Sequence, residues 1–397
     1  MREMHLGDLL ELVIDHRGKT PKKLGGEFTE SGIPVVSAIH IKNGVIQWSE
    51  RERFVSREIY ERWMPVRLRK GDVLLTSEAP LGETALVSSD DDLVLSQRLF
   101  ALRGKKGVLD SQYLRYFLAS QVGQDRLSER ATGTTVAGIR QAELMKVLIP
   151  VPPIDEQRRI AGVLGALDDL IEVNRRLVRD LEALATARFI QVIDALGVDA
   201  ETCSLASTVE ILSGGTPKTS ESTFWNGDIP WFSVADVPSE SQTWVLSTEK
   251  SITEQGLSGS AAKLVPIGST ILTARGTVGK TALAGAPMTI NQSCYALVCR
   301  AGGKGYFNLY RIRAAVGNLQ RMSHGSVFST ITRDTLHSVQ VPSVSAEVIR
   351  VFDAEVDPYF QQMRALIEEN TDLGLARDEL LPLLMSGHVR VSHAVAA

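Results

Sequence analysis

The part of this chain that comes closest to an enzymatic motif is the run ARGTVGKT, residues 274–281. A phosphate-binding loop follows the pattern G-x-x-x-x-G-K-[ST], in which the glycines let backbone N–H groups cradle phosphates. Ala274 stands where this pattern requires its first glycine. The corresponding run in the first half of the chain, SEAPLGET, carries Glu83 where the loop requires lysine. We therefore predict no ATP site in this chain.

A second candidate motif is DPYF at residues 357–360, which has part of an amino-methyltransferase pattern. It lacks the second proline of that pattern and falls in a segment with helical periodicity. No glycine-rich loop follows a strand in the way that a site for S-adenosylmethionine would require. We therefore predict no site for S-adenosylmethionine in this chain.

Cysteine and histidine usage points to no metal site. The cysteines have neither metal-ligand spacing nor an even number for disulfides, which is typical of the reducing cytoplasm; they are Cys203, Cys294 and Cys299. Scattered histidines, expected to be surface or hydrogen-bonded groups, include His40, His324 and His337. No apolar run approaches the roughly 18 residues of a membrane span, and the N-terminus lacks a signal peptide's apolar core. We expect a cytoplasmic protein.

The candidate loops lie in a chain that repeats itself. LIEVN at 170–174 returns as LIEEN at 366–370, an offset of 196. The same offset places five first-half residues on identical residues of the second half: Thr20, Pro21, Ile33, Pro34 and Ser37. The run at 71–86 lies over the run at 268–283 at an offset of 197. This spacing predicts two copies of a globular domain with an appended element, because it far exceeds a solenoid repeat.

Each copy begins with β-rich runs and glycine-containing turns. The predicted strands include IPVVSAIHI (33–41), DVLLTS (72–77) and STILTA (269–274). A helix is expected near 111–121, with its counterpart near 307–320. These patterns predict α+β domains over residues 1–151 and 197–343.

Each domain is followed by a long helix with heptad spacing, over 152–196 and 344–397. The first apolar seam comprises Ile160, Leu164, Leu167, Ile171, Val178, Leu181 and Ala185, and the second Phe352, Val356, Tyr359, Met363, Leu366 and Leu373. Asp155 is a candidate N-cap, Gly197 a candidate stop, and Pro358 a candidate kink or restart. Helices of about 60 Å are expected to pair as an antiparallel coiled coil, giving a pseudo-twofold symmetric fold.

Taken together, the chain resembles the specificity subunits of type I restriction–modification enzymes over essentially its whole length. The resemblance is carried by residues 149–177, by SGGTPKTSESTFWNGDIPWFSVADV (213–237) and by LLPLLMSGHVRV (380–391). Pro153, Glu156 and Gln157 match the family's proline–x–x–glutamate–glutamine opening of its central helix. The first copy lacks the Trp-Asn-Gly-Asp run of the second. That difference bears on which DNA is read, because the family's recognition domains vary most.

The resemblance implies a non-catalytic subunit with two target-recognition domains. Each domain would read one half of a bipartite, asymmetric site in double-stranded DNA, with the half-sites about one helical turn apart. The helices would bind two modification (methyltransferase) subunits, and restriction subunits carrying the motor and nuclease would join them. S-adenosylmethionine, ATP and Mg would be held by those partners, and this chain would hold no cofactor. The purified chain alone is expected neither to methylate nor to cut DNA.

A net charge of −4 permits DNA binding only through localised patches. Cations beside the Thr-Pro turns could reach phosphates, and polar residues of the repeated loops could contact bases or backbone. The predicted DNA-binding residues are Lys19, Lys22, Lys23, Ser37, Ser77, Arg98, Arg140, Lys218, Ser233, Arg275, Gln292 and Ser326. The alternative for each of them is a solvated surface group. Trp225 and Trp231 are expected to pack inside the domain.

Two other classes of function stay open at this point. A free-standing enzyme would need a complete catalytic constellation, which the sequence lacks. A purely structural coiled-coil adaptor would not explain why the chain has two β-rich domains. Activity of the purified chain with a labelled cofactor would support the enzyme, and sequence-specific DNA binding by the assembled complex would exclude the adaptor.

The repeated LIE-x-N motif yields a specific structural prediction. Asn174 and Asn370 interrupt the two apolar seams near the middle of their helices. A polar residue in such a seam costs stability unless it is paired, and it can fix helix register. We predict that the two side chains lie within hydrogen-bonding reach and set the register of the helix pair. The alternative places both on the solvent face.

Overall fold

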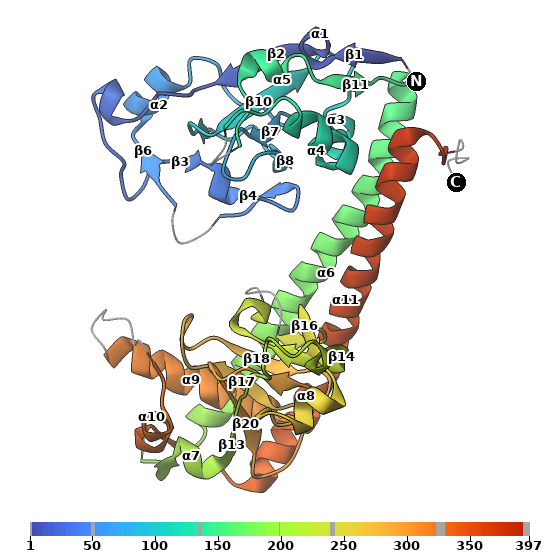
Figure 1. Cartoon of the computed structure of the whole chain (residues 1–397). Helices are drawn as coiled ribbons and strands as arrows, with labels where there is room; N and C mark the ends of the chain where they lie inside the picture. The colour runs from blue at the N-terminus through green and yellow to red at the C-terminus, as the bar shows by residue number, and fades with distance from the viewer. Residues whose placement is uncertain are drawn as a thin grey trace, which may run out of the picture. The chain divides into compact units, whose positions relative to one another are not determined.

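A computed structural model describes residues 2–48, 52–133, 137–197, 199–238, 243–322 and 330–391. The chain divides into two compact units. Unit 1 comprises Met1–Asp169 and Leu373–Ala397, and unit 2 comprises Leu170–Asp372. Both units contain an α+β part together with a portion of two long helices, α6 (Ile154–Asp194) and α11 (Ala346–Ser386) (Figure 1). The expected fold class is confirmed.

Unit 1 is built on an antiparallel sheet with the strand order β2-β10-β7-β8. Its strands are β2 (Leu10–Asp15), β7 (Val73–Thr76), β8 (Thr84–Leu86) and β10 (Leu99–Gly104). Every residue of β7 is buried, because successive side chains point to opposite faces and both faces are covered. Val73 and Leu75 pack into one core with α3 (Ser111–Ala119), whereas Leu74 packs into a second core.

The second core of unit 1 holds a smaller sheet, ordered β6-β3-β9. Its strands are β3 (Ile33–Val36), β6 (Phe54–Val55) and β9 (Val94–Leu95). The predicted strand over 33–41 is therefore interrupted. After Val36 the chain makes a 3-10 turn, Ala38–His40, because Ser37 and His40 form a capping box, and β4 (Ile41–Lys42) follows. The remaining elements are β1 (Glu3–His5), α1 (Leu6–Leu9), β5 (Val45–Ile46), α4 (Gln121–Ser128), α5 (Gln141–Leu144) and β11 (Leu148–Pro150).

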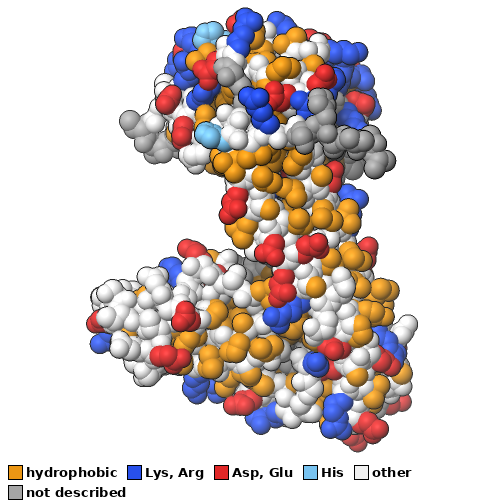
Figure 2. Space-filling view, turned by 90° about the vertical axis from the view of Figure 1, so that its right-hand side faces the viewer, with side chains coloured by type: hydrophobic (Ala, Val, Ile, Leu, Met, Phe, Trp, Pro, Cys, Tyr) orange, Lys and Arg blue, Asp and Glu red, His pale blue; other side chains and the backbone are white. Residues whose placement is uncertain are grey.

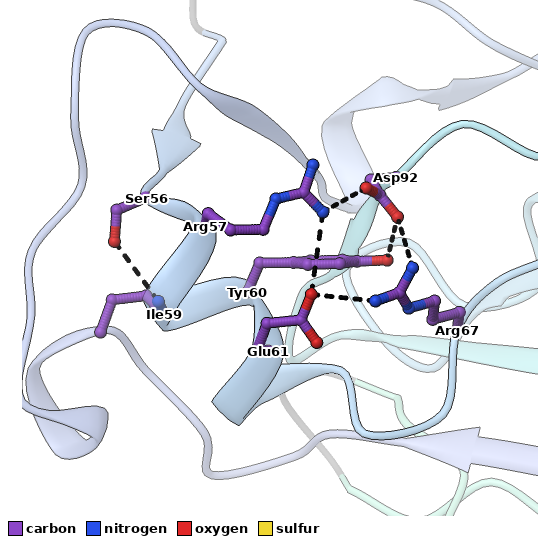
Figure 3. Close-up of polar contacts among 7 residues, drawn as sticks. All are labelled: Ser56, Arg57, Ile59, Tyr60, Glu61, Arg67 and Asp92. Carbon is purple, nitrogen blue, oxygen red and sulfur yellow. Dashed lines mark hydrogen bonds and ion pairs between the residues drawn. The ribbon is translucent and has the colours of Figure 1, made fainter.

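A short helix of unit 1, α2 (Arg57–Trp63), is held by a polar network (Figure 3). Ser56 caps it by accepting from the Ile59 N–H at 3.3 Å. The Tyr60 hydroxyl donates to Asp92 at 2.7 Å, and the guanidinium groups of Arg57 and Arg67 both lie over the Tyr60 ring. The hydrogen bonds from Tyr60 and Arg57 lower the pKa of Asp92. This network fastens α2 to the loop before β9.

Unit 2 repeats the same plan. Its main sheet has the order β13-β20-β17-β18-β15, so its first four strands correspond in order to β2, β10, β7 and β8. These strands are β13 (Val209–Ser213), β15 (Trp244–Val245), β17 (Thr270–Thr273), β18 (Thr281–Ala284) and β20 (Cys294–Cys299). The smaller sheet contains β14 (Trp225–Phe232), β16 (Lys250–Ile252) and β19 (Thr289–Ile290). The other elements are β12 (Thr202–Ser204), α7 (Leu205–Thr208), α8 (Glu254–Ser258), α9 (Tyr306–Met322), α10 (Arg333–Ser338) and β21 (Gln340–Pro342).

Equivalent positions of the two long helices dock the domains of their own units. Gln157 on α6 is fully buried and accepts from the Asp110 N–H at 2.9 Å, just before α3. Asp353 on α11, at the offset of 196, accepts from the N–H groups of Gly305 and Phe307 at the start of α9. Both contacts satisfy backbone donors at a helix N-terminus, which would otherwise be orphaned.

Two details of the predicted helices are wrong. The first backbone bonds of α6 are accepted by Pro153, so Asp155 lies inside the first turn, where its charge suits the helix dipole. At its other end α6 runs to Asp194, and after one more turn Gly197 adopts a left-handed φ of 80°, as expected of a residue that ends a helix. Finally, α11 runs on through Pro358 without a restart, because Pro358 lies on the exposed face, where water can replace the missing hydrogen bond.

The two helices pair antiparallel within each unit. In unit 1, Asp168 pairs with Arg377, and Leu384 packs in the core that contains Ile160. In unit 2, Arg188 pairs with Glu355 at 2.7 Å. The seam of α11 also differs from the prediction at one position. Phe360 is fully buried there, whereas the predicted seam residue Tyr359 is only half-buried, and Leu366 and Ile367 are both buried.

Candidate nucleic-acid interface

A polar hollow of about 340 Å³ lies at one edge of the main sheet of unit 1. The residues that matter for its chemistry are Arg17, Ser77, Glu78, Gln97, Arg98 and Arg140. They come from four segments that backbone hydrogen bonds draw together. The Ser77 N–H donates to the Arg98 carbonyl at 2.9 Å, and the Ile139 N–H donates to the Ser77 carbonyl at 3.0 Å. The sheet therefore fixes the base of the hollow, and the side chains of the turns line it.

The three arginines of the hollow have different surroundings. Arg17 is held by Asp15, with its Nε 2.9 Å from Asp15 Oδ2, and lies over the Phe100 ring. Arg98 makes an ion pair with Glu78, Nε to Oε1, at 3.0 Å. Arg140 is exposed and pairs with no carboxylate among the residues described. The hollow therefore offers one immobilised cation, one cation–anion pair and one unpaired cation.

Unit 2 has the same backbone arrangement with different side chains. The Ala274 N–H donates to the Ser293 carbonyl at 2.8 Å, and the Ile331 N–H donates to the Ala274 carbonyl at 2.9 Å. Ala274 thus occupies the place of Ser77, and Ser293 the place of Arg98. Arg275 forms the isolated bridge with Thr330 that Glu78 forms with Gly138, so the charge at this place is inverted. A hydrogen bond from Thr216 holds Gln292 beside it.

The structure brings only some of the predicted residues to these two places. Ser77, Arg98 and Arg140 line the hollow of unit 1, and Arg275 and Gln292 lie at the equivalent place in unit 2. Ser326 lies outside the described residues. Glu78 and Arg17 were missed by the prediction. The alignment of SEAPLGET with ARGTVGKT contained the signal for Glu78, because it sets a glutamate against an arginine-bearing turn.

The predicted lysines are tethered in part to their own domain. Lys19 donates from Nζ to the Trp63 carbonyl at 3.1 Å, and Lys23 donates from Nζ to the Gly18 carbonyl at 2.8 Å. The Lys19 carbonyl in turn accepts from Gln97 Nε2 at 2.7 Å, which places this turn beside the hollow. Lys22 and Lys218 are exposed, so their charges are available to a partner.

Ser37 and Ser233 occupy equivalent capping positions. Each stands before a 3-10 turn and forms a capping box with the residue three positions on. The Ser233 hydroxyl donates to Asp236 at 2.9 Å. Local capping accounts for both residues without a nucleic-acid contact. Trp231 is buried, donates from Nε1 to the Gly215 carbonyl at 2.9 Å and packs edge-on against Trp225, as expected.

The predicted asparagine contact is observed inside unit 2. Asn174 is buried and donates from Nδ2 to Asn370 Oδ1 at 3.1 Å. The same amide nitrogen donates to Glu369 Oε2 at 2.9 Å. The sequence did not single out Glu369, which satisfies the second amide hydrogen. A role of the asparagine pair in helix register remains a prediction.

The described residues contain no group of histidine, cysteine, aspartate and glutamate side chains that could hold a metal ion. His40 is buried, and this burial lowers the pKa of its ring, which accepts from the Ser37 N–H. No helix within the described ranges is long and apolar enough to cross a membrane.

Both halves of the chain match the same protein family. The family described as type I restriction modification DNA specificity domain matches residues 1–183 and again residues 197–349. This chain belongs to that family. The two matches correspond to the two copies of the repeat.

Individual relatives agree with this assignment. The MjaVIII type I restriction enzyme specificity subunit of Methanocaldococcus jannaschii is 30% identical over 179 residues, covering 44% of this chain and 41% of the relative. The MjaIX specificity subunit of the same organism is 29% identical over 140 residues, covering 35% and 32%. The chain thus spans well under half the length of these relatives. The crystal structure of the type I S subunit from M. genitalium has a TM-score of 0.57 at 17% identity, covering 96% of this chain and 95% of that one, so the fold is shared.

Proposed function

We propose that this chain is the DNA-recognition subunit of a type I restriction–modification complex and reads a bipartite, asymmetric DNA site. The observation that carries the proposal is the repeated backbone arrangement of the two units, which carries opposite charge at one place, Glu78 against Arg275. Two domains that share one fold but carry different side chains would recognise two different half-sites. Residues 1–151 and 197–343 would be the recognition domains, and 152–196 and 344–397 the conserved helices.

DNA contact would divide between phosphates and bases. The exposed cations without a carboxylate partner, Arg140 and Arg275, suit phosphate oxygens or guanine edges. Lys22 and Lys218 flank the two Thr-Pro turns and suit phosphates, which would make binding depend on salt. Gln292 can form two hydrogen bonds to an adenine edge in the major groove. With a net charge of −4, this binding would depend on such local groups of cations and not on the charge of the whole chain.

The helices would bind partner subunits. Four apolar side chains of α6 are 40 to 57% exposed, namely Leu170, Val173, Leu177 and Leu184. Their spacing of three, four and seven residues places them along one face of the helix. Hydrophobic side chains also gather along the helix pair in the space-filling view (Figure 2). Such an exposed stripe is typical of a protein–protein contact, and we assign it to the methyltransferase subunits.

Catalysis and cofactors would belong to those partners. The methyltransferase subunits would hold S-adenosylmethionine, and restriction subunits would hold ATP and Mg. The chain itself would act in the cytoplasm, where it would scaffold these subunits on DNA. A free-standing enzyme and a purely structural adaptor are the alternatives that the next experiment separates from this proposal.

Exchanging residues 1–151 for the equivalent domain of a relative should change one half of the methylated site and leave the other half intact. The reason is that each unit carries its own copy of the backbone arrangement and its own hydrophobic core. Sequencing of methylated adenines in cells that express the chimera with the methyltransferase partner would measure this. Cells that express the chain without the partner are the control and should show no methylation. A change in both half-sites would contradict independent readers.

Replacing Asn174 and Asn370 together with leucine should raise the free energy of unfolding of unit 2 by about 1 kcal/mol, because apolar groups replace a buried polar pair. The same change should loosen the preferred spacer between half-sites, since the pair would no longer fix helix register. Chemical denaturation and methylated-site sequencing measure the two effects. Glu368→Ala, which removes an exposed ion pair with Arg364 and leaves the asparagine contact in place, is the control and should change neither quantity. An unchanged spacer preference would count against the register role.

A further inference from the structure

The ion pair of Glu78 and Arg98 stands out among the residues that line the hollow of unit 1. Both side chains are exposed, at 42 and 59% of their surface. Exposed ion pairs contribute little to stability, so the fold does not require this one. A carboxylate in a DNA-facing hollow is also repelled by phosphates. A Glu78 carboxylate at this place would be favourable for DNA binding only if a group of the DNA donates a hydrogen bond to it.

The free atoms of the pair define what that partner can be. Glu78 engages Arg98 through Nε, and among the described residues neither Nη group of Arg98 has an ion-pair or hydrogen-bond partner. Arg17 differs, because Asp15 engages its Nε and Nη2, and its Nη1 is directed at the Ile139 carbonyl. Arg98 therefore offers two parallel donors, and Glu78 beside it offers an acceptor.

This combination matches the major-groove edge of one base pair. Guanine presents the acceptors N7 and O6, which two parallel arginine donors fit, and its partner cytosine presents the N4 amino donor, which a carboxylate accepts. In an A·T pair the N6 amino donor stands beside the adenine N7 acceptor, so two parallel arginine donors would find only one acceptor on that base. The ion pair also keeps the Arg98 guanidinium beside the Glu78 carboxylate, so that the two groups can face one base pair together.

We propose that Glu78 and Arg98 together read one G·C base pair in the half-site of the first recognition domain, with Arg98 donating to guanine and Glu78 accepting from cytosine N4. The inference rests on the proposed function and specifies one position of the site. Unit 2 lacks this reader, because Arg275 and Ser293 stand at the two places. Its neighbouring turn carries Lys280 where unit 1 carries Glu83.

The experiment compares the sites selected by three variants with the wild-type site. The full chain, assembled with its methyltransferase partner, selects DNA from a library of randomised half-sites. Glu78→Gln should relax the preference for cytosine, and Arg98→Lys, which keeps the charge but loses the paired donors, should relax the preference for guanine at the same position. Each preference should fall about 5- to 150-fold, the discrimination of one good pair. Glu58→Gln, in the exposed Glu58–Arg62 pair of α2, is the matched control and should select the wild-type site.

The outcomes separate this inference from the proposed function. A wild-type complex that selects no sequence would overturn the proposed function itself. A wild-type complex that selects a site, together with both variants selecting the same site unchanged, would overturn only the role of the pair. Equal weakening for every sequence would also overturn it, because that result marks a phosphate contact. Thermal melting of each variant checks folding, and the conservative Arg98→Lys supplies the test if Glu78→Gln unfolds.

Discussion

Replacing Asp168 with asparagine should lower the free energy of unfolding of unit 1 by on the order of 3 kcal/mol. Asp168 on α6 accepts from Arg115 Nη2 at 2.6 Å and from the Tyr116 hydroxyl at 2.5 Å, both on α3. Its other oxygen accepts from Arg377 Nη1 of α11 at 2.8 Å. The Arg115 side chain is only 8% exposed, so removal of the carboxylate charge leaves a buried guanidinium without compensation. Breaking a buried pair in this way is strongly destabilising.

The stability that Asp168 contributes should depend on pH in a defined direction. Burial by itself raises the pKa of Asp168, but hydrogen bonds from Tyr116 and Arg377 and the charge of Arg115 lower it below its usual value. A group whose pKa is lowered by folding stabilises the protein above its unfolded pKa, about 3.9 for aspartate. The difference between wild type and variant should therefore be complete at neutral pH and disappear as the pH falls through the folded pKa.

Hydrogen exchange of the α3 amides, followed across pH, would measure this effect in unit 1 separately from unit 2. The neighbouring exposed Asp169 provides a matched control, because it has no ion pair with a described residue. Asp169→Asn should change stability by no more than about 0.5 kcal/mol. Equal effects of the two substitutions, or a difference that persists at low pH, would show that the Asp168 contacts do not stabilise unit 1.

The fold could be predicted from the sequence because it depends on patterns that repeat. The offset of 196 separated the two copies, and heptad spacing located both long helices. The contact of Asn174 with Asn370 followed from the same spacing. Helix ends were predicted less well, because a first-turn carboxylate such as Asp155 resembles an N-cap in sequence. Pro358 is tolerated because it lies on the exposed face of α11, where water can replace the missing hydrogen bond. The sequence alone does not show which face of the helix is exposed.

The hollow in unit 1 was predicted only in part. Ser77, Arg98 and Arg140 are of types that contact nucleic acid, so composition sufficed to nominate them. Lys19 was nominated for the same reason, although it donates to a backbone carbonyl of its own domain. Glu78 was passed over, because a carboxylate alone argues against DNA. Its meaning depends on the 3.0 Å contact with Arg98, which joins turns 20 residues apart in the chain.

Replacing Phe360 with alanine should lower the free energy of unfolding of unit 2 by about 3–5 kcal/mol, the usual cost of emptying a buried aromatic site. Phe360 on α11 is fully buried and stacks on Tyr306 of α9, with ring centroids 3.9 Å apart. Trp244 and Tyr310 meet the Phe360 ring at their edges. The Trp244 Nε1 donor would keep its bond to the residue 360 carbonyl, so the loss would come from packing.

The effect of Phe360→Ala should differ from that of Asp168→Asn in its dependence on pH and salt. Asp168 contacts Arg115 and Arg377 through ion pairs, whereas the Phe360 ring contacts its neighbours through aromatic packing alone. The cost of Phe360→Ala should therefore be the same from about pH 4 to 9 and at low and high salt, because no ionised group is lost. The loss of unfolding free energy would be measured by denaturant unfolding, monitored through hydrogen exchange of the α9 amides. Val351→Ala, on the exposed face of α11, is the control and should cost little. A salt-dependent loss, or one as small as that of the control, would mean that contacts other than the aromatic cluster hold α11 to unit 2.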